Sequence, residues 1–322
     1  MEKFDIQADQ RLIARLVRAG TQGNAIRALL ELLTNSDDSY RRLEEKKAQH
    51  EGLIEILYRK EGSCGLFTVR DFAEGMSHDD ISAAFRKYGA ATSGLKDGKS
   101  VTGFFGTGAK NALAGMTDGR ICSFKDDSFT NLRIYLEGDS LKGELDDPKP
   151  ATEEMRRQHG ILKNGTAAYF RADPDKGQKV PRFDTVHPAL VEHWRLRKIM
   201  TNPSRTVLLI DVDEKKKKRR LRYSVPKGQE RVNEQFWVSC ENYGEFPIRL
   251  SISRAEKELR QEGDDRQGGL LIIDDYELFW ICPCSSTIAN RWLPAFSARS
   301  HSADSGTFWQ LRNLFSMKKG RG

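Results

Sequence analysis

The sequence has no long apolar run and few cysteines. None of its hydrophobic stretches approaches the roughly 20 residues that a membrane-spanning helix needs, and the N-terminal MEKFDIQADQ lacks the apolar segment of a secretion signal. The five cysteines are odd in number and scattered, so they imply no disulfide framework. Cys282 and Cys284 have one residue between them and no second pair, a spacing that disfavours zinc. We therefore expect a cytoplasmic protein without a membrane partner.

Two common phosphate-binding loops are also missing. The glycine-rich segment 103–108, GFFGTG, has no Gly-Lys-Ser/Thr behind it at the spacing of a Walker loop. Its glycine order also differs from the Rossmann fingerprint. No histidine lies in a phosphoacceptor-like helix ahead of these glycines, which argues against a histidine kinase.

The charge of the chain is unevenly spread. Its net charge of +7 permits a polyanionic partner without establishing one. Much of the excess is one run of six consecutive cations: Lys215, Lys216, Lys217, Lys218, Arg219 and Arg220. Such a run is either a solvated loop tip or a contact for an acidic partner such as DNA. The length of 322 residues, 38% of them hydrophobic, is enough for a full core and favours two domains.

Residues 24–40, NAIRALLELLTNSDDSY, carry two stripes at helical spacing. Apolar residues recur at i, i+3 and i+7, which predicts a helix with one face on a core. Polar residues recur at i, i+4 and i+7 on another face, as Glu31, Asn35 and Asp38. Taken alone, this polar stripe fits a solvated face as well as a site.

Two further stretches favour a site. Residues 69–76, VRDFAEGM, place Asp71 at the exit of a strand, and residues 103–112, GFFGTGAKNA, lead from glycines into a helix. With the helix at 24–40 and Gly165-Thr166, these blocks resemble the Bergerat ATP-binding fold of the GHKL superfamily, which includes gyrase, a heat-shock chaperone, histidine kinases and MutL. Ala73 stands where that family has its first glycine, and its Cβ is expected to loosen the nucleotide.

The resemblance implies ATP and Mg²⁺ as cofactors and gives the motif residues roles. Glu31 would activate the attacking water, and Asn35, one turn later, would offer an amide oxygen to Mg²⁺, which takes few protein ligands. Asp38 would lie near the base or ribose. Asp71 would accept a hydrogen bond from the adenine amino group, helped by a water that Thr166 holds. Without the other blocks, Asp71 would equally fit a turn aspartate at a strand end.

Backbone N–H groups freed by the glycines would bind the phosphates. Lys110, one turn into the following helix, is a candidate phosphate cation. Ser93 and Lys96, in the Gly- and Ser-rich stretch before the glycines, are weaker candidates, and surface solvation is the alternative for Lys96. The predicted nucleotide contacts are Asn35, Asp38, Asp71, Gly75, Met76, Ser93, Lys96, Gly103, Gly106, Thr107, Gly108, Lys110 and Thr166.

The resemblance predicts three units. We expect a two-layer α/β sandwich over residues 1–228, with helices on one face of a mixed sheet. Residues 229–280 are similar to a partial transducer domain, the unit that follows the ATPase fold in the chaperone, gyrase and MutL. Residues 281–322 form an atypical basic tail rich in Ser, Arg, Trp and Cys.

Some local expectations lie at the end of the first unit and in the second. Single helices are predicted at 188–201 and 254–262, and a hairpin strand at 221–225. Within LSISR, Arg254 is similar to a chaperone arginine that contacts the γ-phosphate and would assist catalysis. The alternative for Arg254 is a surface residue at a strand end.

The expected function is slow ATP hydrolysis coupled to closure of a homodimer through residues before Gly20 and residues 90–100. The stretch ATSGLK before the glycines is most similar to MORC-type ATPases, which implies a DNA-associated process and, in bacteria, defence against foreign DNA. The alternative is a nucleotide-gated chaperone or scaffold acting on protein clients, which should show no salt-dependent duplex binding. A degenerate fold that has lost ATP is a third interpretation, raised by Ala73.

Overall fold

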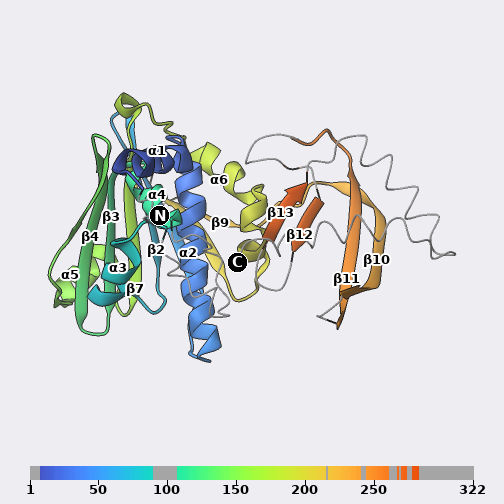
Figure 1. Ribbon diagram of the computed structural model, residues 1–322, viewed down its shortest axis with the longest axis horizontal. Coiled ribbons are helices and arrows are strands. Elements are labelled where there is room, and N and C mark those ends of the chain that lie inside the picture. Colours follow the sequence, from blue (N-terminus) through green and yellow to red (C-terminus); the bar gives the residue numbers. More distant parts are fainter. Residues whose placement is uncertain are drawn as a thin grey trace, which may run out of the picture.

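The largest sheet of the described chain is mixed and has nine strands (Figure 1). The computed structural model describes residues 8–89, 107–214, 217–240, 244–260, 267, 270–273 and 278–282. The strand order is β5-β4-β3-β7-β2-β1-β8-β9, with β6 paired to β4. β1 and β8 are parallel, and the other pairs of this sheet are antiparallel. Its strands are β1 (Leu53–Glu61), β2 (Cys64–Asp71), β3 (Thr117–Lys125), β4 (Ser128–Glu137), β5 (Ser140–Leu145), β6 (Lys149–Pro150), β7 (Gly165–Ala172), β8 (Thr206–Asp211) and β9 (Lys218–Leu221).

Helices α1, α2 and α4 form a layer over this sheet (Figure 1). α2 packs on α4 and β2, and α4 packs on α1 and β3. The described helices are α1 (Gln10–Thr21), α2 (Ala25–Glu45), α3 (His78–Phe85), α4 (Gly108–Ala114), α5 (Glu153–His159), α6 (Phe183–Val191) and α7 (Arg197–Thr201), with 3₁₀ turns η2 (Pro174–Lys176) and η3 (Trp194–Leu196). The expected α/β class is confirmed, and the arrangement is compatible with an α/β sandwich. None of these helices is long and apolar enough to cross a membrane.

The predicted helix at 24–40 forms as α2. Asn24 caps its first turn, where the Asn24 Oδ1 accepts the Ile26 backbone N–H at 2.9 Å. The apolar stripe is buried, with Leu29 and Leu33 at 0% and 1% exposure. The helix therefore sits on the sheet through the side that its periodicity indicates.

The sheet has an apolar cluster on each face, because successive residues of a strand point to opposite sides. On the α2 side, Phe67, Val69 and Phe170 join the buried leucines of α2. On the opposite side, Phe124 and Ala167 belong to a smaller cluster against which Met155 of α5 packs, so α5 covers that face. Polar side chains on the α2 face therefore interrupt an otherwise apolar surface.

Two antiparallel hairpins follow the large sheet. β10 (Gly228–Cys240) pairs with β11 (Gly244–Ala255), and β12 (Leu270–Ile273) pairs with β13 (Leu278–Cys282). The helix predicted at 254–262 is wrong at its start, because Arg254 pairs with Gln229 across the first hairpin and residues 256–260 are not helical. Cross-strand pairing overrides local helix propensity here.

Two predictions near the end of the large sheet also need correction. The single helix predicted at 188–201 is instead α6, η3 and α7, because the chain is extended at His193, whose side chain accepts the Arg195 backbone N–H and starts a new turn. The strand predicted at 221–225 lies earlier, as β9. Leu221 pairs with Val207 and is 2% exposed, so the core fixes this register.

Candidate functional site

Three polar side chains form a row across neighbouring strands on the α2 face. Asp71, the last residue of β2, pairs in register with Thr166 of β7, which pairs with Ser123 of β3. The Oγ of Ser123 lies 3.4 Å from the Oγ1 of Thr166. Asp71 is 5% exposed and Ser123 is fully buried. The sheet therefore presents a buried polar patch where the core would otherwise continue.

Asp71 is the charged member of this row. Its Oδ2 accepts a hydrogen bond from Ser36 Oγ of α2, and its Oδ1 accepts the Ala73 backbone N–H, both at 3.2 Å. Burial raises the pKa of Asp71 to about 6. None of the described cationic side chains forms an ion pair with it. A buried carboxylate without a paired cation is costly, which makes Asp71 a candidate for contact with a ligand.

The three residues of the polar stripe of α2 differ in their exposure to solvent. Asn35 is exposed, the side chain of Glu31 is 30% exposed, and Asp38 is only 5% exposed. The two residues predicted to act on Mg²⁺ and water are therefore accessible to solvent. The residue predicted near the base, Asp38, is buried.

Glu31 is held between two distant parts of the chain. Its Oε1 accepts a hydrogen bond from Arg195 Nη2 at 2.7 Å, and the two side chains form an ion pair. A Cβ added at Gly108, the first residue of α4, would collide with Glu31 Oε2. The structure thus brings together two of the predicted site residues, Glu31 and Gly108, and adds Arg195, which no sequence motif indicated.

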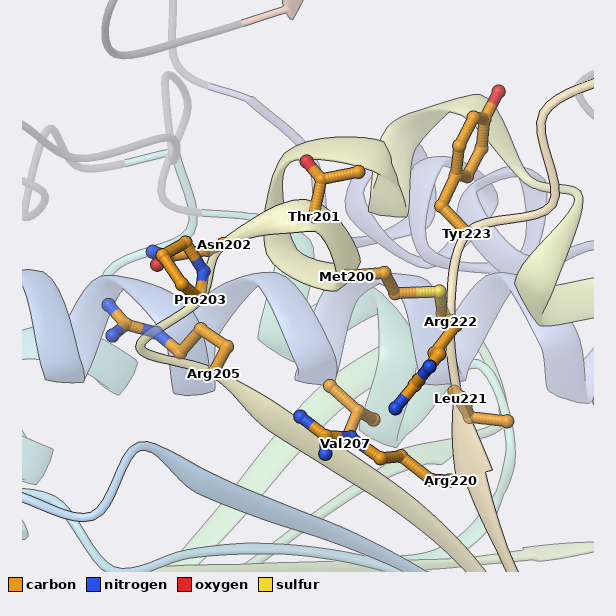
Figure 2. A pocket seen from close by; sticks show the side chains of 10 residues that line it. All are labelled: Met200, Thr201, Asn202, Pro203, Arg205, Val207, Arg220, Leu221, Arg222 and Tyr223. Atoms are coloured by element: carbon orange, nitrogen blue, oxygen red, sulfur yellow. The ribbon is translucent and has the colours of Figure 1, made fainter.

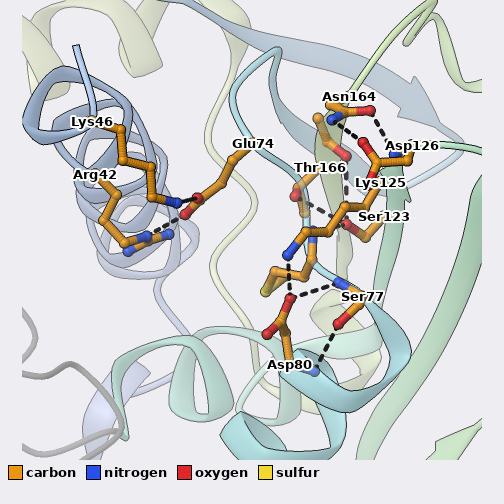
Figure 3. Close-up of polar contacts among 12 residues, drawn as sticks. Arg42, Lys46, Glu74, Ser77, Asp80, Ser123, Lys125, Asp126, Asn164 and Thr166 are labelled. Atoms are coloured by element: carbon orange, nitrogen blue, oxygen red, sulfur yellow. Dashed lines mark hydrogen bonds and ion pairs between the residues drawn. The ribbon is translucent and has the colours of Figure 1, made fainter. Parts of the chain in front are cut away.

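The loop between β2 and α3, residues 72–77, is hydrogen-bonded to the polar row (Figure 3). The backbone N–H of Met76 donates to Ser123 Oγ at 2.7 Å. Gly75 has φ +65°, and a Cβ there would collide with the carbonyl oxygen of Phe124. The glycine is therefore required both by its backbone conformation and by close contact with β3. Ala73, in contrast, fits with 4% exposure.

Charged contacts fix this loop at both ends (Figure 3). Glu74 pairs with Arg42 and Lys46 of α2. Asp80 forms a capping box with Ser77 and an ion pair with Lys125 of β3 at 2.6 Å. Burial alone would raise the pKa of Asp80, but hydrogen bonds from Lys125 and Ser77 lower it to about 2. The loop is thus anchored to the helix layer and to the sheet.

Lys110 does not face an open site in this structure. Its Nζ donates to the Ala84 carbonyl at 2.6 Å and lies 5.2 Å from the centre of the Phe85 ring. Burial lowers the pKa of Lys110 to about 8. The side chain therefore ties α4 to the end of α3, and its phosphate role stays a prediction. Thr107 directly precedes α4 and makes no side-chain cap.

The remaining predicted residues fall outside this cluster. Ser93, Lys96, Gly103 and Gly106 lie outside the described residues, as do Lys215 and Lys216. Arg254 is exposed on β11, which Figure 1 shows away from α2 and α4. Within the described ranges, no group of three or more His, Cys, Asp or Glu side chains could hold a metal ion.

Comparison with known proteins adds no assignment to this geometry. No model of a protein family matches the sequence, and no curated protein matches it either.

Proposed function

We propose that this chain binds ATP in a Bergerat-type site and hydrolyses it. The observation that carries the proposal is the buried, unpaired Asp71 beside Thr166 and Ser123. A carboxylate that has no cation can be compensated by a ligand that brings a hydrogen-bond donor into the pocket. The exocyclic amino group of adenine is such a donor, whereas guanine has a carbonyl at the equivalent position.

The geometry of α2 supports an elongated ligand. Ser36 contacts Asp71, and Glu31 precedes Ser36 by five residues, which is about 7.5 Å along a helix axis. The Asp71 end of the proposed site, which would hold the base, and the Glu31 end are therefore separated along α2. A nucleotide with its base at Asp71 and its phosphates toward Gly108 would run along this helix. Its terminal phosphate would then lie beside the Glu31 carboxylate.

The accessible residues of α2 suit the chemistry of phosphoryl transfer. Glu31 offers a carboxylate to orient water, and Asn35, exposed one turn later, offers an amide oxygen to Mg²⁺. Arg195 Nη2 lies 2.7 Å from Glu31 Oε1 and would hold this carboxylate in place beside the expected γ-phosphate. Residues 229–280 would transmit the nucleotide state as a partial transducer domain, and nucleotide-dependent dimer closure would serve a DNA-associated process.

A nucleotide titration tests the proposal. ATP should bind by calorimetry and bind more tightly with Mg²⁺ than with a chelator, and phosphate release should follow. GTP is the matched control, because it has the same phosphates and the wrong base edge; it should bind far more weakly. Equal binding of ATP and GTP would contradict the assignment of Asp71, and no binding of either would contradict the proposed function.

A further inference from the structure

The described part of the cationic run, residues 217–222, alternates between two sides along β9 and the residues that flank it. Lys217 and Arg219 point toward α6, where both pair with Asp184 and both lie over the Phe183 ring, at 5.5 and 5.1 Å from its centre. Their charge is therefore partly neutralised, and their stems cover an apolar ring. These two cations have a structural use within the fold.

The alternate cations lack acidic partners. Lys218, Arg220 and Arg222 are exposed, and none of the carboxylates in the described part of the chain pairs with them. Arg220 donates to the Thr206 hydroxyl, at 3.3 Å. Residues two apart on a strand are about 6.6 Å apart and face the same side. The edge strand therefore presents a repeating row of unpaired positive charge.

A cleft of about 210 Å³ lies beside this row, between the end of α7 and the ends of β8 and β9. Figure 2 shows the guanidinium groups of Arg220 and Arg222 turned into the same space. Thr201 and Asn202 line the opposite wall and bring neutral donors. Arg205 also lines the cleft, but its guanidinium is occupied by Asp37 and Glu44.

Two guanidinium groups side by side without an acid repel each other. Phosphate oxygens remove that repulsion, because an arginine fork can bind two of them at once. A single small anion would satisfy the cleft but leave Lys218 unused. A linear polyanion with regularly spaced phosphates fits the whole row.

We propose that the surface formed by Lys218 and Arg220 of β9 and by Arg222 just after it, with the adjoining cleft, binds the phosphate backbone of a nucleic acid. The proposal supplies the contact surface for the DNA-associated part of the proposed function. It does not depend on ATP hydrolysis, because the row and the cleft lie on the β8–β9 edge rather than at Asp71.

Two double variants of the full chain remove the same charge from opposite faces of one strand. Arg220→Gln with Arg222→Gln should weaken binding of a fluorescent random-sequence duplex about tenfold or more. It should also reduce the slope of log affinity against log salt by about 2, since each lost phosphate contact removes about 0.9. Lys217→Gln with Arg219→Gln is the matched control and should bind nearly as the wild type. Arg220→Lys with Arg222→Lys should retain most of the salt slope.

Several results would overturn the proposal. Equal loss of duplex affinity in both Gln variants would mean that binding depends on the net charge of the protein and not on one surface of β9. Failure of the wild type to bind duplex, or preference for phosphatidylserine vesicles or inorganic phosphate, would exclude a nucleic-acid surface. ATP titrations of the same variants, with melting curves as a check on folding, separate this outcome from failure of the nucleotide site.

Discussion

Asp71 is the buried carboxylate on which the proposed nucleotide site rests. Asp71→Asn places an amide donor where the adenine amino group needs an acceptor, so ATP binding should be lost. The mismatch of a buried polar pair costs roughly 1–3 kcal/mol or more. Calorimetric titration with ATP measures the loss. Unchanged ATP affinity with a normal melting curve would contradict the role of Asp71.

The same variant should change how stability depends on pH. Burial raises the folded-state pKa of Asp71 from 3.8 to about 6, so the folded protein holds this proton more tightly than the unfolded chain does. The contribution of Asp71 to stability is therefore present at low pH and falls as the pH rises from about 4 to about 6, by on the order of 3 kcal/mol. Urea unfolding at both ends of this window should show this fall in wild type but not in Asp71→Asn.

Substitution of Glu31 should separate ATP binding from ATP hydrolysis. Glu31→Ala removes the carboxylate that orients water, so phosphate release should drop about 10²–10⁴-fold. ATP should still bind, because Asp71 and the residues around it remain. Asn35→Ala serves as a contrast, since it should also lose the Mg²⁺-dependent part of binding. Wild-type turnover by Glu31→Ala would show that the water is activated elsewhere.

Arg195 is a positioning residue for Glu31. Its guanidinium holds one carboxylate oxygen at 2.7 Å, while the other lies against Gly108. Arg195→Ala should lower kcat about tenfold and leave the ATP Kd nearly unchanged, because the contact orients Glu31 without reaching the base. Arg195→Lys should restore part of kcat.

A nearby arginine provides the control for this variant. Arg197 lies over the Tyr223 ring at 5.8 Å, whereas the ion pair that Glu31 forms among the described residues is with Arg195, so Arg197→Ala should leave kcat unchanged. A matching loss of kcat in both variants, or an equal rise in Kd, would indicate a structural role for Arg195 instead.

The loop from β2 to α3 depends on one glycine. Gly75→Ala should destabilise the protein by several kcal/mol, because φ is +65° and the added Cβ meets the Phe124 carbonyl. Gly62→Ala, with φ +58° and open space around it, is the matched control and should cost only about 1 kcal/mol. Urea unfolding measures the stability of both variants. Equal losses of stability would mean that the positive φ, and not the contact with Phe124, determines the cost.

The sequence predicted those elements whose pattern lies within a short stretch of the chain. The stripe of α2 and the strand that ends at Asp71 follow from patterns within short stretches of the chain. The glycine motif around Gly75 was predictable, although the sequence did not reveal that Phe124 is what excludes a side chain there. Breaks set by a single capping contact, such as that at His193, were missed.

Contacts made by distant residues were not predictable. Ser123 joins the polar row only because β3 pairs with β7, 43 residues along the chain, and nothing in its neighbours marks it. Arg195 is 164 residues from Glu31 and sits in a stretch rich in other cations, so its spacing carries no signal. Strand register and helix docking decide both positions.

At the scale of the whole molecule, an exposed apolar stripe on α1 bears on assembly. Leu12 and Leu16 are 48% and 46% exposed and one turn apart, while Ala14 and Val17 on the other side are fully buried. α1 packs on α4, whose first residue lies against Glu31, so a change at the proposed nucleotide site has a short route to this stripe. The stripe is therefore the surface of α1 that a second copy of the chain could cover.

Dimerisation should follow nucleotide binding and depend on that stripe. With a non-hydrolysable ATP analogue, light scattering should report a dimer, and Leu12→Ser with Leu16→Ser should weaken it about a hundredfold or more, since each lost apolar contact counts twice in a symmetric interface. Leu162→Ser is the control, because Leu162 is 70% exposed on another part of the surface. A wild type that stays monomeric with saturating analogue would contradict nucleotide-driven closure. A dimer that both variants form equally well would instead place the interface away from α1.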